Sequence, residues 1–203
     1  MKITSVKQQV KRSDRYSVYV DGAYSFSLSE AELLKQGLRS GQELSDSELT
    51  DLKKDARLDK ARLGAFDQLS RRPRSEWELR EYLKRKEYDP EVIDKVLAYL
   101  LERQYIDDAE FARRWVENRR LLKPVSKRRL IQELKQKRVD ETHINTALQE
   151  DAADERKVLQ ELIEKKRRQT KYQDDQKLMQ FLARQGFSYD DIKSAVAYTR
   201  EHE

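Results

Sequence analysis

Cysteine is absent from this chain of 203 residues, and glycine and proline are scarce, with five and three residues. Without cysteine the chain can form neither disulfides nor thiolate metal sites. The longest wholly apolar stretch, residues 96–101, is far shorter than the roughly 18 residues needed to cross a bilayer. The first residues also lack the apolar run of a signal peptide. We therefore expect a cytoplasmic protein without a membrane segment.

The motifs of common enzyme sites are also missing. The sequence contains no phosphate-binding P-loop, no GxGxxG pattern and no GxSxG pattern. Its two histidines, His143 and His202, lie in a predicted capping turn and at the tail. Adjacent carboxylates, which can hold metal ions, occur in three pairs: Asp107-Asp108, Asp174-Asp175 and Asp190-Asp191. All three pairs lie at or near predicted helix starts, where they complement the helix dipole, so we expect no enzyme, no cofactor and no small-molecule substrate.

Charged residues make up 40% of the chain and apolar residues 37%. A single thick core is therefore not expected. Apolar residues nevertheless recur periodically along nearly the whole chain, which predicts a folded protein with thin, extended packing. The 43 Lys and Arg residues outnumber the 38 Asp and Glu residues, and this excess permits an anionic partner without requiring one.

Residues 1–44 are predicted to form a small β-containing N-terminal cap. Apolar and polar residues alternate on both sides of Asp21-Gly22, which is typical of a two-residue hairpin turn with positive φ at both positions. Residues 3–10 could supply a third strand. Ser29 and the acidic residues after it predict the start of a short helix that Gly37 can end.

From Ser45 onward the pattern is helical. Ser45 and Glu48 have the spacing of a capping box, in which each residue satisfies a backbone N–H of the other. A first apolar stripe covers residues 49–56 and a second covers residues 63–69. The second stripe either continues the same helix or begins another after a break near Asp59.

An internal repeat is the most informative feature of the chain. Five apolar positions recur at offsets of 51 (130 − 79) and then 48 (178 − 130) residues: Leu79, Leu83, Tyr88, Ile93 and Leu97; Leu130, Leu134, Val139, Ile144 and Leu148; Leu178, Leu182, Phe187, Ile192 and Val196. Residues suited to cap helices fall in the same register: Ser75, Ser126 and Asp174 before each second helix, and Asp89, Asp140 and Ser188 before each third helix. Each repeat is therefore predicted to contain three helices.

We predict a mainly α fold built from tandem three-helix repeats. Residues 45–107 would hold a linking helix and the first repeat, residues 108–151 the second repeat, and residues 152–203 the third. The first helices are expected at 60–70, 108–121 and 154–168. A unit of this size buries little apolar surface alone, so each repeat should stack on its neighbour.

Lysine and arginine gather near the junction of the first and second helices in every repeat. The first basic cluster comprises Arg71, Arg72 and Arg74; the second comprises Arg119, Arg120, Lys123, Lys127, Arg128 and Arg129; the third comprises Lys165, Lys166, Arg167 and Arg168. If a regular rotation relates the repeats, these clusters would form an interrupted basic ridge that suits a repeating anionic partner. The alternative is ordinary solvated surface, which is common in so charged a chain.

Several segments resemble the RecX family of regulatory proteins. They are residues 70–80 (SRRPRSEWELR), 105–108 (YIDD), 126–134 (SKRRLIQEL) and 181–189 (FLARQGFSY). The resemblance covers about residues 60–200, whereas the first 60 residues resemble the family's variable leader only loosely. It implies a curved, elongated helical protein that lies in the groove of RecA filaments on single-stranded DNA. It further implies restraint of filament growth, strand exchange, ATP hydrolysis and coprotease activity, and hence a role in DNA repair, recombination and the SOS response.

The chain departs from the family where glycine tends to follow the second helix of each repeat. Gly186 fits this pattern, but Glu87 and Arg138 occupy the other two positions. If these two residues adopt the left-handed conformation, each costs on the order of 1 kcal/mol. Otherwise the turn differs there, and so would the relative tilt of the second and third helices.

A direct DNA-binding protein is the alternative function. Three-helix units resemble helix-turn-helix modules, and the basic ridge could contact single- or double-stranded DNA. The helix that would enter the major groove, however, lacks a run of base-reading Arg, Asn or Gln in every repeat. We therefore favour a protein that regulates the RecA nucleoprotein filament.

Overall fold

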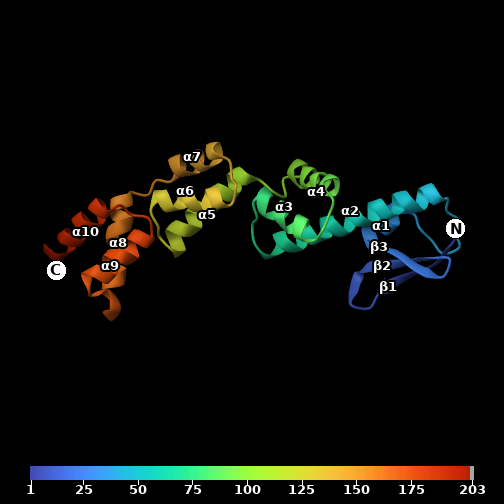
Figure 1. The fold of residues 1–203 in the computed structure, drawn as a ribbon, viewed down its shortest axis with the longest axis horizontal. Helices are drawn as coiled ribbons and strands as arrows, with labels where there is room; N and C mark the ends of the chain where they lie inside the picture. Colours follow the sequence, from blue (N-terminus) through green and yellow to red (C-terminus); the bar gives the residue numbers. More distant parts are fainter. Residues whose placement is uncertain (202–203) are drawn as a thin grey trace. The chain divides into compact units, whose positions relative to one another are not determined.

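The computed structural model describes residues 1–201 (Figure 1). Its contacts divide the chain into two compact units. The first unit comprises Met1–Arg74 and Glu78–Tyr105. The second unit comprises Ser75–Trp77 and the described residues from Ile106 onward. The short segment Ser75–Trp77 therefore belongs, by its contacts, with the repeats that follow it.

The first unit begins with an antiparallel sheet of three strands in the order β1-β2-β3. The strands are β1 (Ile3–Gln9), β2 (Arg12–Val20) and β3 (Ala23–Ser29). Asp21 and Gly22 connect β2 to β3 with φ values of 48° and 84°, as the hairpin signal predicts. The predicted hairpin and the third strand are both confirmed.

A short helix and a long helix follow the sheet, α1 (Glu30–Gln36) and α2 (Asp46–Arg71). Helix α2 is continuous through Asp59, so the two apolar stripes belong to one helix. Asp59 is 2% exposed and accepts hydrogen bonds from the N–H and the hydroxyl of Ser29, both at 2.8 Å. Its buried carboxylate thus holds the end of β3 against α2 instead of breaking the helix.

The remaining helices form the three predicted repeats. They are α3 (Glu76–Arg85) and α4 (Pro90–Glu102) after α2; α5 (Asp108–Leu122), α6 (Lys127–Gln136) and α7 (Glu141–Glu150); and α8 (Glu155–Arg167), α9 (Asp175–Arg184) and α10 (Tyr189–Glu201), with a 3-10 turn at Thr170–Tyr172. The matched leucines of the second helices are fully buried: Leu79, Leu83, Leu130, Leu134, Leu178 and Leu182. The mainly α fold with tandem three-helix repeats is confirmed.

Most of the expected helix caps form side-chain hydrogen bonds. Ser126, Asp174, Asp140 and Ser188 each accept a bond from a backbone N–H in the first turn of the helix that follows. Asp89 makes no such bond, although Pro90 does occupy the first position of α4. The cap pattern therefore locates the helix starts correctly even where the cap itself is not made.

Two hydrogen bonds recur where a second helix meets the repeat that follows it, and we call this arrangement the repeat junction. At α6, the N–H of Lys127 donates to Oε1 of Glu155 over 2.9 Å. The N–H of Ser126 donates to the carbonyl of Gln185 over 3.1 Å. Helix N-terminal N–H groups have no partner inside their own helix, and a carboxylate there also complements the helix dipole. The junction therefore satisfies donors that the helix cannot satisfy itself.

The start of α3 shows a similar arrangement within the second unit: the bond to a carboxylate recurs, but the donor of the second bond is a serine hydroxyl and not a backbone N–H. The N–H of Glu76 donates to Oδ1 of Asp108 over 2.9 Å, and the hydroxyl of Ser75 donates to the carbonyl of Lys137 over 3.0 Å. Glu76 and Lys127 are 51 residues apart (127 − 76), which is the repeat offset. Burial raises the pKa of the Asp108 carboxyl. The sequence repeat thus extends to the polar contacts between repeats.

The turn after each second helix keeps one conformation in all three repeats. Glu87, Arg138 and Gly186 have φ values of 58°, 55° and 92°. Glu87 and Arg138 thus adopt the left-handed conformation, and each accepts the cost of about 1 kcal/mol for a non-glycine residue. At Gly186 the absence of a side chain has a second reason, because an added Cβ would lie 2.5 Å from Oγ of Ser126. The same Cβ would lie 2.8 Å from Cβ of Arg129.

Replacing Gly186 with alanine should destabilise the second unit through this contact. We expect G186A to lower the free energy of unfolding by about 2–4 kcal/mol, the sum of backbone strain and overpacking. Gly37→Ala is the matched control, since Gly37 has φ of 61° but no atom within 4 Å of an added Cβ. G37A should cost only about 1 kcal/mol. Urea unfolding followed by circular dichroism measures both, and equal losses would show that the close approach contributes nothing.

Candidate functional site

The acidic pairs act as helix caps and ion-pair partners. Asp107 accepts bonds from two N–H groups in the first turn of α5, and Asp174 accepts one at the start of α9. Asp175 forms an ion pair with Arg167. Within residues 1–201, no group of three or more His, Asp or Glu side chains is placed to hold a metal ion. The helix-start explanation of these carboxylates is confirmed.

The two histidines give no further site. His143 is half-buried in the first turn of α7, and His202 lies outside the described residues.

None of the helices that the structure describes has both the length and the apolarity required to span a membrane.

The first basic cluster is largely neutralised by neighbouring side chains. Arg72 donates two hydrogen bonds to Glu78, at 3.0 and 2.8 Å, and these bonds raise the pKa of its guanidinium. Arg71 pairs with Asp67 over 2.9 Å. Arg74 donates to Gln68, and burial together with repulsion from Arg72 lowers its pKa. Arg71 and Arg72 are therefore paired with carboxylates, whereas the hydrogen-bond partner of Arg74 is a neutral amide.

Four residues of the second repeat form a mixed basic and aromatic surface around one buried carboxylate. Glu133 accepts hydrogen bonds from the indole N–H of Trp115 (3.0 Å), Nε of Arg119 (2.8 Å) and Nε of Arg129 (3.4 Å). The Arg119 guanidinium also lies 5.2 Å from the centre of the Trp115 ring, and the Lys137 ammonium lies 5.4 Å from it. Two arginines, Arg119 and Arg129, thus share one carboxylate, which leaves this pair of cations with more positive charge than Glu133 neutralises.

Arg120 has a structural role and is not part of this basic and aromatic surface. Its side chain is 11% exposed and that of Asp151 is 7% exposed, and the two form an ion pair at 2.7 Å. Arg120 also donates to the carbonyl of Val125 over 2.6 Å. These bonds hold the end of α5 to the residue that follows α7, so Arg120 faces away from solvent.

Lys123 and Arg128 are the exposed cations of the second basic cluster that lack partners. Neither forms an ion pair or a side-chain hydrogen bond with any residue that the structure describes. Lys123 ends α5, and Arg128 lies in the first turn of α6. Lys127, between them in sequence, is half-buried, and its backbone N–H is used in the repeat junction. Unpaired charge in this cluster is therefore concentrated at Lys123 and Arg128.

The third basic cluster divides in the same way. Arg167 bonds to the carbonyls of Tyr172 and Gln173 and pairs with Asp175, so it is part of the local structure. Lys166 lies over the Tyr172 ring, 5.3 Å from its centre. Lys165 and Arg168 are exposed and have no ion pair within the described part of the chain.

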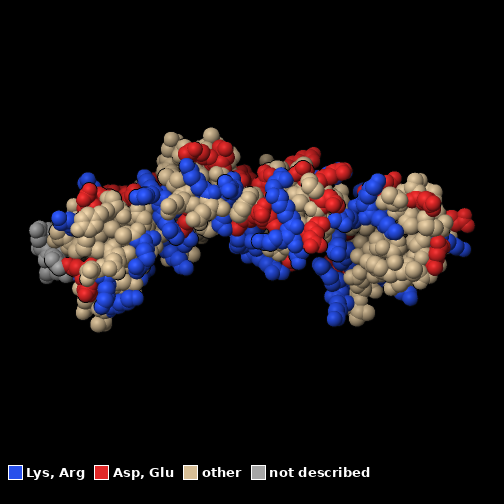
Figure 2. Space-filling model, viewed as in Figure 1, with Lys and Arg blue, Asp and Glu red and all other residues tan. Residues whose placement is uncertain are grey.

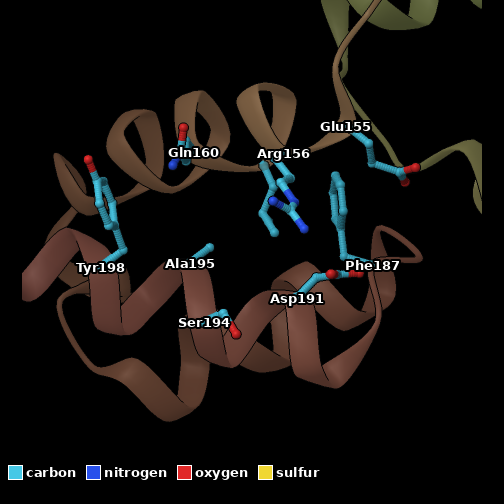
Figure 3. A pocket seen from close by; sticks show the side chains of 9 residues that line it. Glu155, Arg156, Gln160, Phe187, Asp191, Ser194, Ala195 and Tyr198 are labelled. Atoms are coloured by element: carbon cyan, nitrogen blue, oxygen red, sulfur yellow. The ribbon is translucent and has the colours of Figure 1, made fainter.

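A pocket of about 500 Å³ also lies in the third repeat, between α8 and α10 (Figure 3). Arg156 enters it from α8, and Phe187 and Asp191 face it from the other side. Its lining combines this one arginine with two carboxylates, Glu155 and Asp191, and Glu155 already accepts the junction bond from Lys127. The pocket therefore does not extend the positive surface of the basic clusters.

Four family models match this chain. The model of the regulatory protein RecX N-terminal domain matches residues 1–45. The models of the first, second and third RecX three-helix domains match residues 61–100, 107–148 and 154–196. These matches follow the N-terminal sheet and the three helical repeats in order.

Known proteins with similar sequences carry the same family description. The regulatory protein RecX of Bacillus subtilis is 32% identical over 199 residues, which cover 96% of this chain and 75% of that protein. The one of Bacillus cytotoxicus is 33% identical over 209 residues, covering 98% and 77%. A crystal structure of regulatory protein RecX matches with a TM-score of 0.68 and 27% identity, over 97% of this chain and 98% of that one. A RecX structure from Lactobacillus salivarius, at 21% identity and a TM-score of 0.57, covers 70% of this chain and 96% of that one and shares the fold.

Loss of charge at two arginines of the second basic cluster should change stability by different amounts. Arg120→Met should lower the free energy of unfolding by about 3 kcal/mol, because it leaves Asp151 buried without its partner. Arg128→Met removes the same charge from an exposed position and should change stability by less than about 0.5 kcal/mol. Urea unfolding of both variants checks the difference. Similar values for the two would contradict the division into structural and exposed cations.

Proposed function

This chain belongs to the RecX family of regulatory proteins, and we propose that it binds RecA filaments on single-stranded DNA and restrains their activities. The activities concerned are filament growth, strand exchange, ATP hydrolysis and coprotease activity. The observation that carries the proposal is the exposed, unpaired charge at Lys123 and Arg128, beside the basic and aromatic surface around Glu133.

Unpaired cations suit a partner with negative charge. A cation that already has a carboxylate partner must lose that partner or share it before it binds another anion. Lys123 and Arg128 have no such competitor among the described residues, so their charge is available at no structural cost. Electrostatic complementarity of this kind raises association rates and fixes the register of a complex more than it raises affinity.

The proposed contact surface is therefore narrower than the three basic clusters. We place it on Lys123, Arg128 and the surface formed by Arg119, Arg129 and Lys137, with Lys165 and Arg168 as further contacts. Arg120 and Arg167 are excluded from the contact surface because they stabilise the fold. The paired arginines of the first cluster, Arg71 and Arg72, are excluded for the same reason. The partner atoms would be carboxylates of RecA or phosphates of its DNA.

Reversing the charge of Lys123 and Arg128 together should weaken inhibition of RecA. We expect the K123E/R128E variant to need about tenfold more protein for half-inhibition of the RecA ATPase, equivalent to about 1.4 kcal/mol. The assay uses RecA on single-stranded DNA with substoichiometric protein. Helicity by circular dichroism should be unchanged, because both side chains are exposed.

Lys53→Glu with Lys193→Glu is the matched control. Both lysines are exposed, lie outside the basic clusters and form no ion pair with described residues, so the change in net charge is the same. This control should inhibit like the parent chain. Equal weakening by both double variants would show that only net charge matters, and unchanged inhibition by K123E/R128E would remove these residues from the contact.

The direct DNA-binding alternative is separated by a measurement without RecA. Tight binding to DNA that the K123E/R128E variant loses, with a steep loss of affinity as salt rises, would favour the alternative. Inhibition at concentrations where free DNA is not bound would favour recognition of the RecA filament.

A further inference from the structure

An open cavity of about 510 Å³ lies within the first unit, where the N-terminal sheet meets α2 and α3. Four cations line it, namely Arg12, Arg15, Lys60 and Lys86. No aspartate or glutamate is among the lining residues that the structure describes. Figure 2 shows Lys and Arg side chains gathered beside the tip of the β1–β2 hairpin, which borders this region. In a chain with nearly as many acidic as basic residues, such a one-signed lining is unusual.

Arg15 is the most informative of these cations. It is only 4% exposed, and its guanidinium donates to the carbonyl and the hydroxyl of Ser27, at 3.1 and 2.8 Å. It forms no ion pair with any carboxylate of the described residues. Buried charges are otherwise paired, because removal from water is costly without a counter-charge. A negatively charged ligand in the cavity would therefore supply the counter-charge that Arg15 lacks.

Two of the other cations are also without a carboxylate. Lys60 and Lys86 are exposed and form no ion pair within residues 1–201, whereas Arg12 is 3.8 Å from the exposed Asp14. Three unpaired cations around one cavity exceed what the single charge of a carboxylate would neutralise. A ligand with phosphate groups would neutralise these three cations better than a ligand with a single carboxylate.

Two tyrosines complete the lining. Gly64 lets Tyr82 approach α2 closely, since an added Cβ would lie 2.9 Å from the Tyr82 hydroxyl. Burial raises the pKa of Tyr88, so its hydroxyl stays protonated and can donate a hydrogen bond to an anion. Both rings are half-buried, which leaves part of each ring at the cavity. Aromatic rings beside a basic groove are typical of sites for single-stranded nucleic acid, where bases stack and phosphates meet cations.

We propose that this cavity binds a single-stranded nucleic acid, with a phosphate at Arg15, Lys60 and Lys86 and a base near Tyr82 and Tyr88. The cavity volume lies in the range of sites for small ligands, so it holds about one nucleotide unit of a longer strand. The site lies in the first unit and is distinct from the basic clusters of the second repeat. It does not depend on the regulation of RecA.

The test measures binding of a fluorescent twelve-residue oligothymidylate to the full chain by anisotropy. Lys60→Glu with Lys86→Glu should weaken binding about a hundredfold. The slope of log affinity against log salt should become shallower by about 1.4, since each single-stranded phosphate contact contributes about 0.7. The control Lys53→Glu with Lys193→Glu should change affinity less than about threefold. Equal effects of the two double variants would overturn the proposal.

A footprint locates the contact without any substitution. Acetylation of Lys60 and Lys86, followed by mass spectrometry, should be suppressed by the oligonucleotide, whereas Lys53 should react as before. Unprotected Lys60 and Lys86 at saturating oligonucleotide would overturn the proposal.

Competition separates the sources of negative charge. Unlabelled oligothymidylate should displace the probe at far lower concentration than polyglutamate of equal charge or inorganic phosphate. Equal displacement by polyglutamate would make the cavity a site for acidic peptides. Equal displacement per phosphate by inorganic phosphate would make it a site for the free anion, and either result would overturn the assignment to a strand.

Discussion

The peptide N–H groups at the start of the second helices are the constraint around which the second unit is built. Each helix begins with donors that it cannot satisfy itself, and the first helix of the next repeat supplies a carboxylate to one of them. Glu155 meets Lys127 in this way, and Asp108 meets Glu76. Between the second and third repeats, which lie in one unit, the bond from Lys127 to Glu155 adds a directional polar contact to the buried apolar surface. At Gly186 the backbone lies so close to Ser126 and Arg129 that an added Cβ would clash with both.

The same packing decides which positive charges remain available. The ends of the first helices lie close to carboxylates of their own repeat. Arg120 forms an ion pair with Asp151, and Arg167 forms one with Asp175, so both arginines stabilise the fold. Glu133 binds two cations, Arg119 and Arg129, but neutralises only one charge. Within the second basic cluster, the charge that remains unpaired lies at helix ends, at Lys123 after α5 and at Arg128 in the first turn of α6. The proposed binding surface therefore consists of cations that the fold does not use.

The sequence predicted the architecture well because it is encoded locally. Alternation around Asp21-Gly22, cap residues in register and apolar positions at constant offsets identify the hairpin, the helix starts and the repeats. It could not show that Asp59 accepts bonds from Ser29, which is 30 residues away, nor that Arg120 reaches Asp151 across 31 residues. Trp115 and Lys137 were missed for the same reason, although Trp115 and Arg119 are four residues apart and share a helix face. Burial of Arg15, which follows three polar residues at the start of β2, had no signal in the pattern.

Hydrogen exchange of this protein on RecA filaments reports which backbone segments the partner covers, and so checks whether residues 119–129 lie in the contact. We predict that amides in residues 119–129, from the end of α5 to the start of α6, exchange more slowly when the filament is present than when it is absent. Those of the solvent-facing helix ends outside the basic clusters should exchange at the same rate in both states. Slower exchange confined to other segments, with residues 119–129 unchanged, would contradict the account.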